Sequence, residues 1–318
     1  MTDAAPPTGL ACYLCGGTAL DLVRTKVRHA DRDVYLCQTC GLDFLAPNER
    51  DLREYYATDY RNEFGHAVGE PANSQQIFDV YEPFQAPRIE LLKSYLPTDG
   101  RMLDIGASAG HFLAACAPHV AERVAVELNL DNAQFIRDTQ GIDAYTTPVE
   151  ETDLPKEHFD LITCFQTMEH IPDPRNFLQQ VREYLKPDGW LYVEVPNVDD
   201  ALLSVHGVGE YADFWYREPH LYNFSPATLT QLMDQAGFTG EILPVQRYGL
   251  LNHMNWLLAR QPQPSAGVAM GEPALVPTAK SDADTELNAW FSRVDQEYRE
   301  LLRKHVVSES IGFIGKKS

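Results

Sequence analysis

Four cysteines in this chain have the types and spacing of a metal site. They form two pairs, Cys12-x-x-Cys15 and Cys37-x-x-Cys40. Two such pairs offer four thiolates to a tetrahedral ion, and four sulfur ligands leave no open coordination position. A redox pair would come singly, and disulfides do not suit a cytosolic chain. The spacing therefore predicts a structural zinc ion.

The stretch from Asp104 to Gly110, DIGASAG, allows two kinds of chemistry. Residues 106–110 match G-x-S-x-G, the elbow that presents a nucleophilic serine in hydrolases. They also fit a glycine-bearing turn from a strand into a helix, which can hold a nucleotide-like cofactor. The elbow needs several strands and an HGGG-like loop before Ser108, and the preceding residues hold cysteines and helix-like segments instead. We therefore favour the cofactor turn.

An acid follows this turn where a ribose would lie. Glu127 ends the next apolar run, RVAVE, and a carboxylate there can accept both hydroxyl protons of a ribose. A nicotinamide fingerprint would need glycines where this chain has Ser108 and His111. Asp104 precedes the turn, where it would repel a pyrophosphate but suit a cationic ligand that carries an amino acid. This combination points to S-adenosylmethionine.

The elements that must position these residues alternate between strand and helix from residue 101 onward. Strands are predicted at 101–105, 122–128, 142–146, 159–165, 190–195, 241–247 and 310–318. Helices are predicted between them at 110–120, 130–139, 174–186 and 225–238. Strict alternation is typical of a parallel sheet covered on both faces. We therefore predict an α/β fold with a doubly wound, seven-stranded, mostly parallel sheet.

Three regions make up the predicted domain organisation. Residues 1–50 are too few to bury a core, so the metal must replace one, and they form a small zinc-binding domain. Residues 51–84 form a helical connector or lid that contains Tyr55, Tyr56 and Tyr60. Residues 85–318 form the main domain, with an insertion at about 250–308. Within the insertion, the Pro-, Gly- and Ala-rich stretch 261–282 predicts a loop before a helix at 285–306.

Four segments resemble, in order, the motifs of class I S-adenosylmethionine-dependent methyltransferases: LDIGASAGHFL, VAVELN, FDLITCFQTMEHIPDP and YLKPDGWLYVEVPN. The resemblance covers about residues 85–247 and implies the Rossmann-like methyltransferase fold. CYLC…CQTCGLDFL, with YYATDY, further resembles a subgroup that has a zinc-binding leader. Some members of that subgroup methylate carbon atoms of nucleotide-linked deoxysugars. Those sugar C-methyltransferases carry a further large domain, for which we expect no counterpart in this sequence.

The resemblance implies a cofactor site after the first four strands of the sheet. The implied contacts are Asp104, Gly106 and Gly110 around the methionine part, Glu127 at the ribose, Val149 and Glu150 at the adenine edge, and Phe165 and Gln166 beside the cofactor. Ala107, Ser108 and Leu128 complete the predicted cofactor-binding set.

Methyl transfer is an in-line displacement from a sulfonium, and it needs a base only where the nucleophile holds a proton. Histidine suits that role because it titrates near neutral pH. His220, in FWYREPHLYNF, follows the fifth strand, where an acceptor pocket opens in a doubly wound sheet. We predict His220 as the base, with Tyr222 and Glu218 orienting it or the acceptor. The alternative is a histidine that packs an aromatic lid.

Glu169 and His170 form a second candidate catalytic group. In some quinone-precursor methyltransferases a related E-x-x-E-H stretch holds a divalent metal, but the first acid is replaced here by Gln166. We therefore expect Glu169 and His170 to shape the acceptor floor rather than complete a metal site. Asn252, His253 and Trp256 could reach the same pocket from the insertion, or pack its helices.

The charge balance bears on the partners of this chain. Lys and Arg total 26 against 46 Asp and Glu, a formal charge of −20, which disfavours nucleic acid. No apolar run is long enough to cross a membrane, and the N-terminus lacks signal-peptide features, so we expect a cytoplasmic protein. The predicted function is methyl transfer to a small-molecule acceptor, such as a sugar or nucleotide-sugar. A zinc-ribbon RNA methyltransferase and a non-catalytic zinc-mediated protein-binding module are the alternatives, and nothing indicates an oligomeric state.

Overall fold

A seven-stranded sheet with the order β10-β11-β8-β7-β4-β5-β6 forms the centre of the computed structural model, which describes residues 6–47 and 72–318. Its strands are β4 (Arg101–Ile105), β5 (Glu122–Val126), β6 (Asp143–Tyr145), β7 (Phe159–Phe165), β8 (Leu185–Pro196), β10 (Phe238–Val245) and β11 (Ser310–Lys317). Strands β8, β7, β4, β5 and β6 pair in parallel, and β11 is antiparallel to both of its neighbours. The predicted doubly wound, mostly parallel sheet is therefore confirmed.

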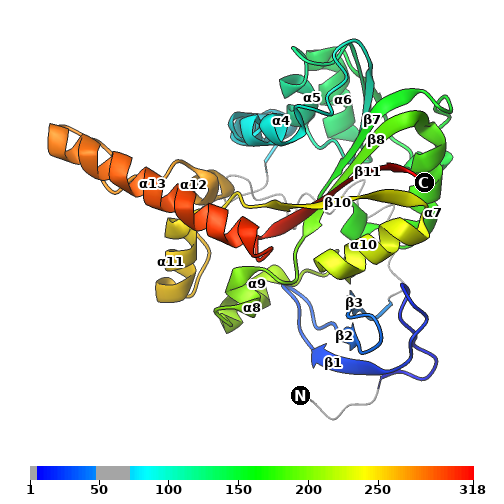
Figure 1. Ribbon diagram of the computed structural model, residues 1–318, viewed down its shortest axis with the longest axis horizontal. Coiled ribbons are helices and arrows are strands. Elements are labelled where there is room, and N and C mark those ends of the chain that lie inside the picture. Colours follow the sequence, from blue (N-terminus) through cyan, green and yellow to red (C-terminus); the bar gives the residue numbers. More distant parts are fainter. Residues whose placement is uncertain (1–5, 48–71) are drawn as a thin grey trace.

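Helices cover both faces of this sheet (Figure 1). The helices around it are α3 (Ser74–Tyr81), η1 (Glu82–Phe84), α4 (Ala86–Leu92), α5 (His111–Ala115), α6 (Leu130–Gln140), α7 (Pro174–Tyr184) and α10 (Pro226–Gln235). Helices α4, α5 and α6 share one buried cluster with Met102 and Leu161, whereas α7 and α10 share another with the adjacent Leu103 and Ile162. Successive strand residues thus face opposite layers, as a sheet buried on both sides requires.

Helix α7 ends two residues earlier than the sequence predicts. Its start is fixed by Asp173, whose side chain accepts a hydrogen bond from the Asn176 N–H, and Pro174 occupies the first turn. Leu185 is fully buried and begins β8, so the Lys186-Pro187 segment belongs to the strand rather than to the helix. Burial of Leu185 in the core decides the boundary.

A second sheet contains the N-terminal segment and has the order β1-β2-β3-β9. Its strands are β1 (Leu20–Arg24), β2 (Val34–Cys37), β3 (Asp43–Leu45) and β9 (Tyr222–Asn223), all antiparallel. Strand β9 comes from the segment that follows β8, and it pairs Phe44 with Tyr222. Leu22 and Phe44 belong to the same buried cluster as Phe177 of α7. The N-terminal unit therefore packs on the α7 and α10 side of the main sheet (Figure 1). Its fourth strand, β9, comes from the chain segment that follows β8.

Three helices lie between β10 and β11: α11 (Leu250–Ala259), α12 (Ala266–Met270) and α13 (Asp282–Lys304). Helix α13 projects away from the sheet (Figure 1). The predicted loop 261–282 contains α12, because the Ser265 side chain caps that helix at Val268 and Met270 is buried. The remaining short helices are η2 (Val149–Glu151), η3 (Met168–His170), α8 (Ala201–Ser204) and α9 (Gly209–Trp215).

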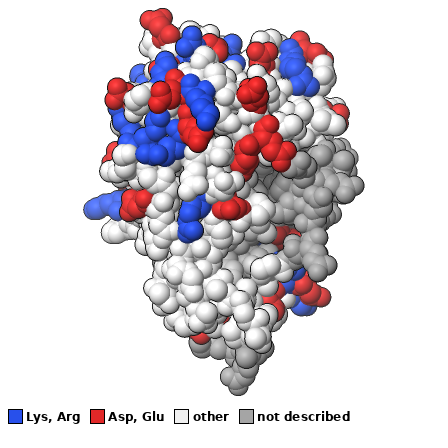
Figure 2. Space-filling view, turned by 90° about the vertical axis from the view of Figure 1, so that its right-hand side faces the viewer, with Lys and Arg blue, Asp and Glu red and all other residues white. Residues whose placement is uncertain are grey.

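The first part of the predicted connector, residues 51–71 with Tyr55, Tyr56 and Tyr60, lies outside the described residues. Among the helices that the structure describes, none combines the length and apolar character needed to span a bilayer. Figure 2 shows one face of the molecule, where Lys and Arg side chains are interspersed with Asp and Glu rather than gathered into a basic patch.

Candidate active site

The predicted cofactor residues follow the carboxyl ends of four neighbouring parallel strands. Residues 106–110 follow β4, residues 127–128 follow β5, residues 149–150 come after β6, and Phe165 and Gln166 end and follow β7. Because these strands are parallel, their carboxyl ends meet at one edge of the sheet. That edge, beside the switch in strand order, is where ligands bind in open α/β sheets.

The turn after β4 brings the backbone close to β7. Gly106 and Gly110 have φ angles of 77° and 76°, and Ser108 lies between them at 55°. A Cβ atom at Gly106 would overlap the Thr167 hydroxyl, and one at Gly110 would come within 2.7 Å of the Gln140 side chain. Glycine is therefore required at both positions by conformation and by space.

Glu127 fixes the shape of the edge beside this turn. Its Oε2 accepts a hydrogen bond of 2.7 Å from the Ser108 N–H, and its Oε1 accepts one of 2.8 Å from the Asn129 N–H. Asn129 in turn caps helix α6 through the Asn132 N–H. The carboxylate, which is 8% exposed, is thus held in one orientation at the end of β5. This position suits a ribose acceptor because anionic oxygens form the stronger hydrogen bonds.

Asp104 lies beneath the turn and is 2% exposed. Its Oδ1 accepts a hydrogen bond of 2.7 Å from the Thr163 hydroxyl on the neighbouring strand β7. Burial raises the pKa of Asp104 to about 7, and the nearby Glu127 also raises it. A positive charge placed above the turn would favour the ionised form of this carboxyl.

The other predicted cofactor residues flank the same edge. Val149 is buried, and its carbonyl accepts from the Tyr184 hydroxyl at 3.2 Å, while Glu150 is half-buried. The Phe165 ring ends β7 and lies 4.6 Å from the Phe112 ring. Gln166 has a φ angle of 50°, and its side-chain amide lies 3.3 Å from a Glu194 carboxylate oxygen. These contacts fix the edge from both sides of the turn.

Glu169, His170 and His220 come together although the last is far from the others in sequence. Their possible ligand atoms all lie within 4.8 Å of one another, and all three side chains are buried. The His170 Nδ1–H donates to the Pro219 carbonyl at 2.9 Å, which turns Nε2 toward Glu169 Oε1 at 3.8 Å. The two imidazole rings meet edge to face at 4.8 Å. The sequence predicted each residue but not this grouping.

Burial sets the protonation of this cluster. It lowers the pKa of His170 to about 4 and that of His220 well below its usual value, and it raises the pKa of Glu169 to about 8. The histidines are therefore neutral at neutral pH. Among the described residues, His220 Nδ1 and both Glu169 oxygens have no hydrogen-bond partner. Buried polar atoms of this kind need an explanation, and a bound ligand supplies one.

Tyr222 and Glu218, predicted to orient the base, use their polar groups within the protein. The Tyr222 hydroxyl donates to the Pro172 carbonyl at 2.8 Å, and its ring lies 5.2 Å from that of Tyr13. Glu218 Oε1 lies 3.4 Å from Arg32 Nη1. Both residues join the N-terminal unit to the segment that carries His220.

The sequence did not indicate a buried ion-pair network at the neighbouring strand ends. Glu194 on β8 is fully buried and lies 2.9 Å from Arg88 Nη2 and 3.9 Å from Arg247 Nη1. Arg247 Nε lies 2.8 Å from Glu309, and the Arg88 guanidinium lies 4.2 Å from the centre of the Phe165 ring. Single arginines and acids scattered over four segments form no local pattern, so no sequence signal could have identified them.

His253 and Trp256 make their contacts with aromatic residues near the insertion. His253 Nδ1 lies 2.7 Å from the Tyr298 hydroxyl on α13. The Trp256 ring packs against Tyr211 at 5.0 Å and Phe214 at 5.1 Å. Their observed contacts are those of helix packing.

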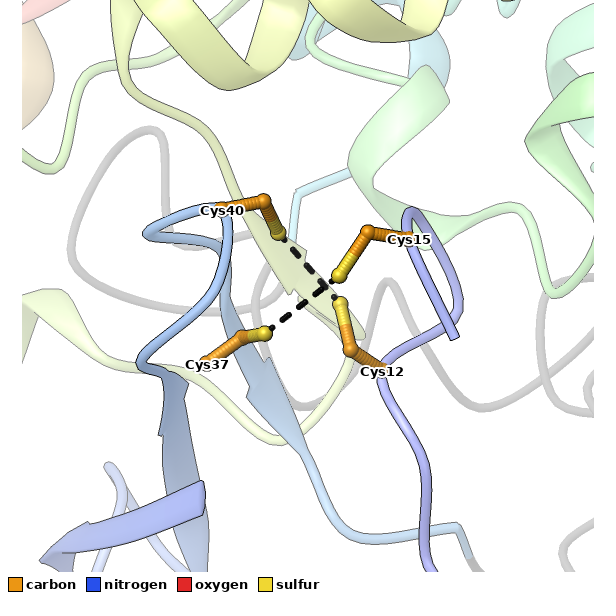
Figure 3. Close-up of side chains that lie close together, drawn as sticks. All are labelled: Cys12, Cys15, Cys37 and Cys40. Atoms are coloured by element: carbon orange, nitrogen blue, oxygen red, sulfur yellow. Dashed lines mark hydrogen bonds between the residues drawn. The ribbon is translucent and has the colours of Figure 1, made fainter. Parts of the chain in front are cut away.

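The four N-terminal cysteines point toward one another, as Figure 3 shows. Cys12 and Cys40 Sγ lie 3.6 Å apart and Cys15 and Cys37 Sγ lie 3.5 Å apart, and none is in a disulfide. Sulfurs on a tetrahedral zinc ion, with Zn–S bonds of about 2.3 Å, are separated by about 3.8 Å. The sulfur positions therefore fit such an ion.

Comparisons with known proteins bear on the family of this chain. A family model described as a methyltransferase domain matches residues 78–241. A ubiquinone biosynthesis O-methyltransferase from Histophilus somni is 31% identical over 174 residues, which cover 50% of this chain and 73% of that protein. One from Actinobacillus pleuropneumoniae is 27% identical over 171 residues, covering 49% and 73%. A solved S-adenosylmethionine-dependent methyltransferase from Archaeoglobus fulgidus aligns with 74% of this chain and 94% of its own, at 18% identity and a TM-score of 0.49.

Proposed function

Because this chain belongs to the S-adenosylmethionine-dependent methyltransferase family, we propose that it methylates a small polar acceptor, with His220 as the base that removes the acceptor's proton. The observation that carries the proposal is the single edge of the sheet on which the glycine turn, the fixed Glu127 carboxylate and the buried Glu169–His170–His220 cluster all lie. When bound, the cofactor supplies an activated methyl group on a sulfonium.

The chain's own residues divide the binding of that cofactor among them. Glycine lets the backbone of the turn 106–110 approach the cofactor closely, and the turn is held in shape because the Gly106, Ser108 and Gly110 N–H groups donate within the protein. Glu127 accepts hydrogen bonds from the ribose hydroxyls, and Asp104 favours the positive end of the ligand. Val149 and Glu150 border the adenine, and Phe165 with Gln166 closes the side next to the acceptor.

His220 is available to accept a proton at neutral pH. Its lowered pKa keeps the imidazole neutral at neutral pH. Its Nδ1 has no hydrogen-bond partner among the described residues. An acceptor hydroxyl at Nδ1 would give up its proton as the oxygen forms its bond to carbon. Burial raises the pKa of Glu169 to about 8, so this carboxyl is protonated at neutral pH and adds no negative charge beside the base. Burial of all three excludes competing water.

The accepting group follows from this base. A hydroxyl oxygen needs proton removal, and the names of the two curated relatives, ubiquinone biosynthesis O-methyltransferases, support oxygen as the accepting atom. We propose a small hydroxyl-bearing acceptor, a class that includes sugars and nucleotide-sugars. The zinc proposed at Cys12, Cys15, Cys37 and Cys40 has a structural role, because β9 ties its sheet to the segment that holds His220.

Calorimetry on the zinc-loaded full chain tests the cofactor part of the proposal, and transfer of a labelled methyl group to a panel of hydroxylated acceptors tests the reaction. We expect S-adenosylmethionine to bind with one site per chain and label to appear on an acceptor oxygen. Absence of cofactor binding would remove the methyltransferase proposal. Label on carbon or nitrogen would retain the methyltransferase and overturn the oxygen assignment.

A further inference from the structure

Two arginines lie side by side where the N-terminal unit meets the segment that carries His220. Arg28 forms a parallel β-bridge with Arg217, and the Arg28 N–H donates to the Tyr216 carbonyl at 2.7 Å. Residues paired across neighbouring strands send their side chains to the same side. Both side chains are half-buried, and the Arg28 guanidinium lies 4.0 Å from the centre of the Phe214 ring. Two cations are thus brought together at a partly enclosed site.

Neither guanidinium forms an ion pair with an acid among the described residues, although the charge of Arg217 reaches the buried Glu169. The acids nearest in sequence are used by other arginines: Asp213 pairs with Arg24, and Glu218 pairs with Arg32. Other arginines that have an acidic partner are Arg88, Arg101, Arg247, Arg260 and Arg299. The chain has a formal charge of −20, so acids are plentiful. Other arginines without an ion pair, such as Arg123 and Arg137, lie apart from one another and donate to backbone carbonyls, whereas Arg28 and Arg217 bring two positive charges together at a place that a negative charge from outside the chain would fit.

The pair is close to the proposed base. Arg217 and His220 end the same tight turn, in which the His220 N–H donates to the Arg217 carbonyl at 3.1 Å. The end residues of such a turn have Cα atoms less than about 7 Å apart. The positive charge of Arg217 also acts on the pKa values of Glu169 and His170. Arg217 therefore lies close to the region in which the acceptor would lie.

We propose that Arg28 and Arg217 form an oxyanion-binding subsite, so that the acceptor carries a phosphate or carboxylate group. This inference rests on the proposed function, because it assigns part of the acceptor of that same reaction. A planar carboxylate and a tetrahedral phosphate both present a pair of oxygen atoms that a guanidinium can bind with two parallel hydrogen bonds. An acceptor held by its anion at Arg217 would present a hydroxyl toward His220.

Charge repulsion supports this assignment over a structural one. Burial and, to a smaller extent, the positive charge of the neighbouring Arg217 together lower the pKa of Arg28 to about 10. Like charges held together in a partly buried site destabilise the empty state, and an anion between them reverses the sign of the interaction. Substitution of Arg217 therefore costs the free protein little stability but removes ligand binding.

Calorimetric titration of the full zinc-loaded chain with inorganic phosphate, and separately with acetate, tests the subsite at constant ionic strength. We expect one site per chain in the wild type for at least one of the two anions. Arg217→Gln and Arg28→Gln should each weaken that binding by about tenfold or more, since hydrogen bonds to charged groups are the stronger ones. Arg293→Gln, on the exposed side of α13, should leave it unchanged.

The outcomes separate this proposal from the proposed function. S-adenosylmethionine affinity should stay within about twofold in all three variants. No binding of either anion to the wild type, or equal anion binding by the wild type and both Gln variants, overturns the subsite and leaves the methyltransferase proposal standing. Loss of cofactor binding by the wild type overturns the methyltransferase instead. Should the Gln variants fail to fold, Arg217→Lys keeps the charge but loses the paired hydrogen bonds, and binding unchanged from the wild type would count against the subsite.

Discussion

The backbone N–H of Ser108 donates to Glu127 Oε2 at 2.7 Å, which joins the turn after β4 to the end of β5. Through this bond, Glu127 has both a structural role in the turn and a role in binding the cofactor. It holds the turn in its left-handed conformation, and it leaves the carboxylate fixed where a ribose would meet it. The serine of the G-x-S-x-G match therefore acts through its backbone, as part of a cofactor turn.

Glu127→Ala should weaken S-adenosylmethionine binding by at least about tenfold, because a charged acceptor contributes roughly 1.5–3 kcal/mol to a hydrogen bond. Calorimetry measures the change. Glu241→Ala, an exposed acid on β10, is the matched control and should bind normally. Equal affinities in the two variants would take Glu127 out of the cofactor site.

Gly106→Ala should lower the free energy of unfolding and the cofactor affinity more than Gly141→Ala does. Both glycines have positive φ angles, 77° and 63°. The conformational strain is roughly 1–2 kcal/mol at each position. Only at Gly106 does the added Cβ also overlap the Thr167 side chain; at Gly141 nothing lies within 4 Å. Urea unfolding and cofactor titration check the difference. Equal losses in the two variants would mean that Thr167 moves away without cost.

Asp104 should make the cofactor-free protein less stable as the pH rises from about 4 to about 7. Burial raises the pKa of Asp104 from 3.8 to about 7, so over this interval the folded carboxyl keeps a proton that the unfolded one has released. The free energy of unfolding therefore falls with rising pH. The Asp104→Asn side chain cannot ionise. Between pH 5 and pH 7 the free energy of unfolding should therefore fall by at least about 1 kcal/mol less in this variant than in the wild type. Urea unfolding at pH 5 and pH 7 measures this difference. An equal fall in the free energy of unfolding of the two proteins would contradict the prediction.

The sequence predicted the cofactor turn and its acid because these features are local. The glycine spacing requires a particular turn, and Glu127 is placed by the end of an apolar strand. The grouping of His220 with Glu169 depends instead on how a long loop returns to the sheet. That path is fixed by the pairing of Phe44 with Tyr222, which no local pattern encodes. The same pairing brings Arg28 beside Arg217, two residues that periodicity alone would leave unrelated.

Removal of the metal should affect turnover through this shared strand. Cys37→Ser should lose the bound zinc, which elemental analysis measures, and turnover should fall by about tenfold or more as β9 loses its support. Cofactor affinity should change less, because the turn after β4 lies in the main sheet. Cys116→Ala removes a buried cysteine outside the cluster and should keep one zinc per chain. A fully zinc-loaded Cys37→Ser variant would contradict the four-cysteine site.

His220→Ala should reduce kcat by about a hundredfold or more, because general-base catalysis typically contributes factors of that size. His119→Ala, at an exposed position after α5, controls for the loss of a histidine and should leave kcat unchanged.

Burial lowers the pKa of His220 well below its usual value, so the base stays neutral as the pH falls. Below pH 7, where Glu169 is already protonated, the wild-type rate should accordingly show no midpoint near pH 6.5, the value at which an ordinary histidine is half protonated. A midpoint near 6.5 would mean that the working base is a more exposed group. A rise in the acceptor KM with kcat unchanged would show that His220 positions the acceptor without removing its proton.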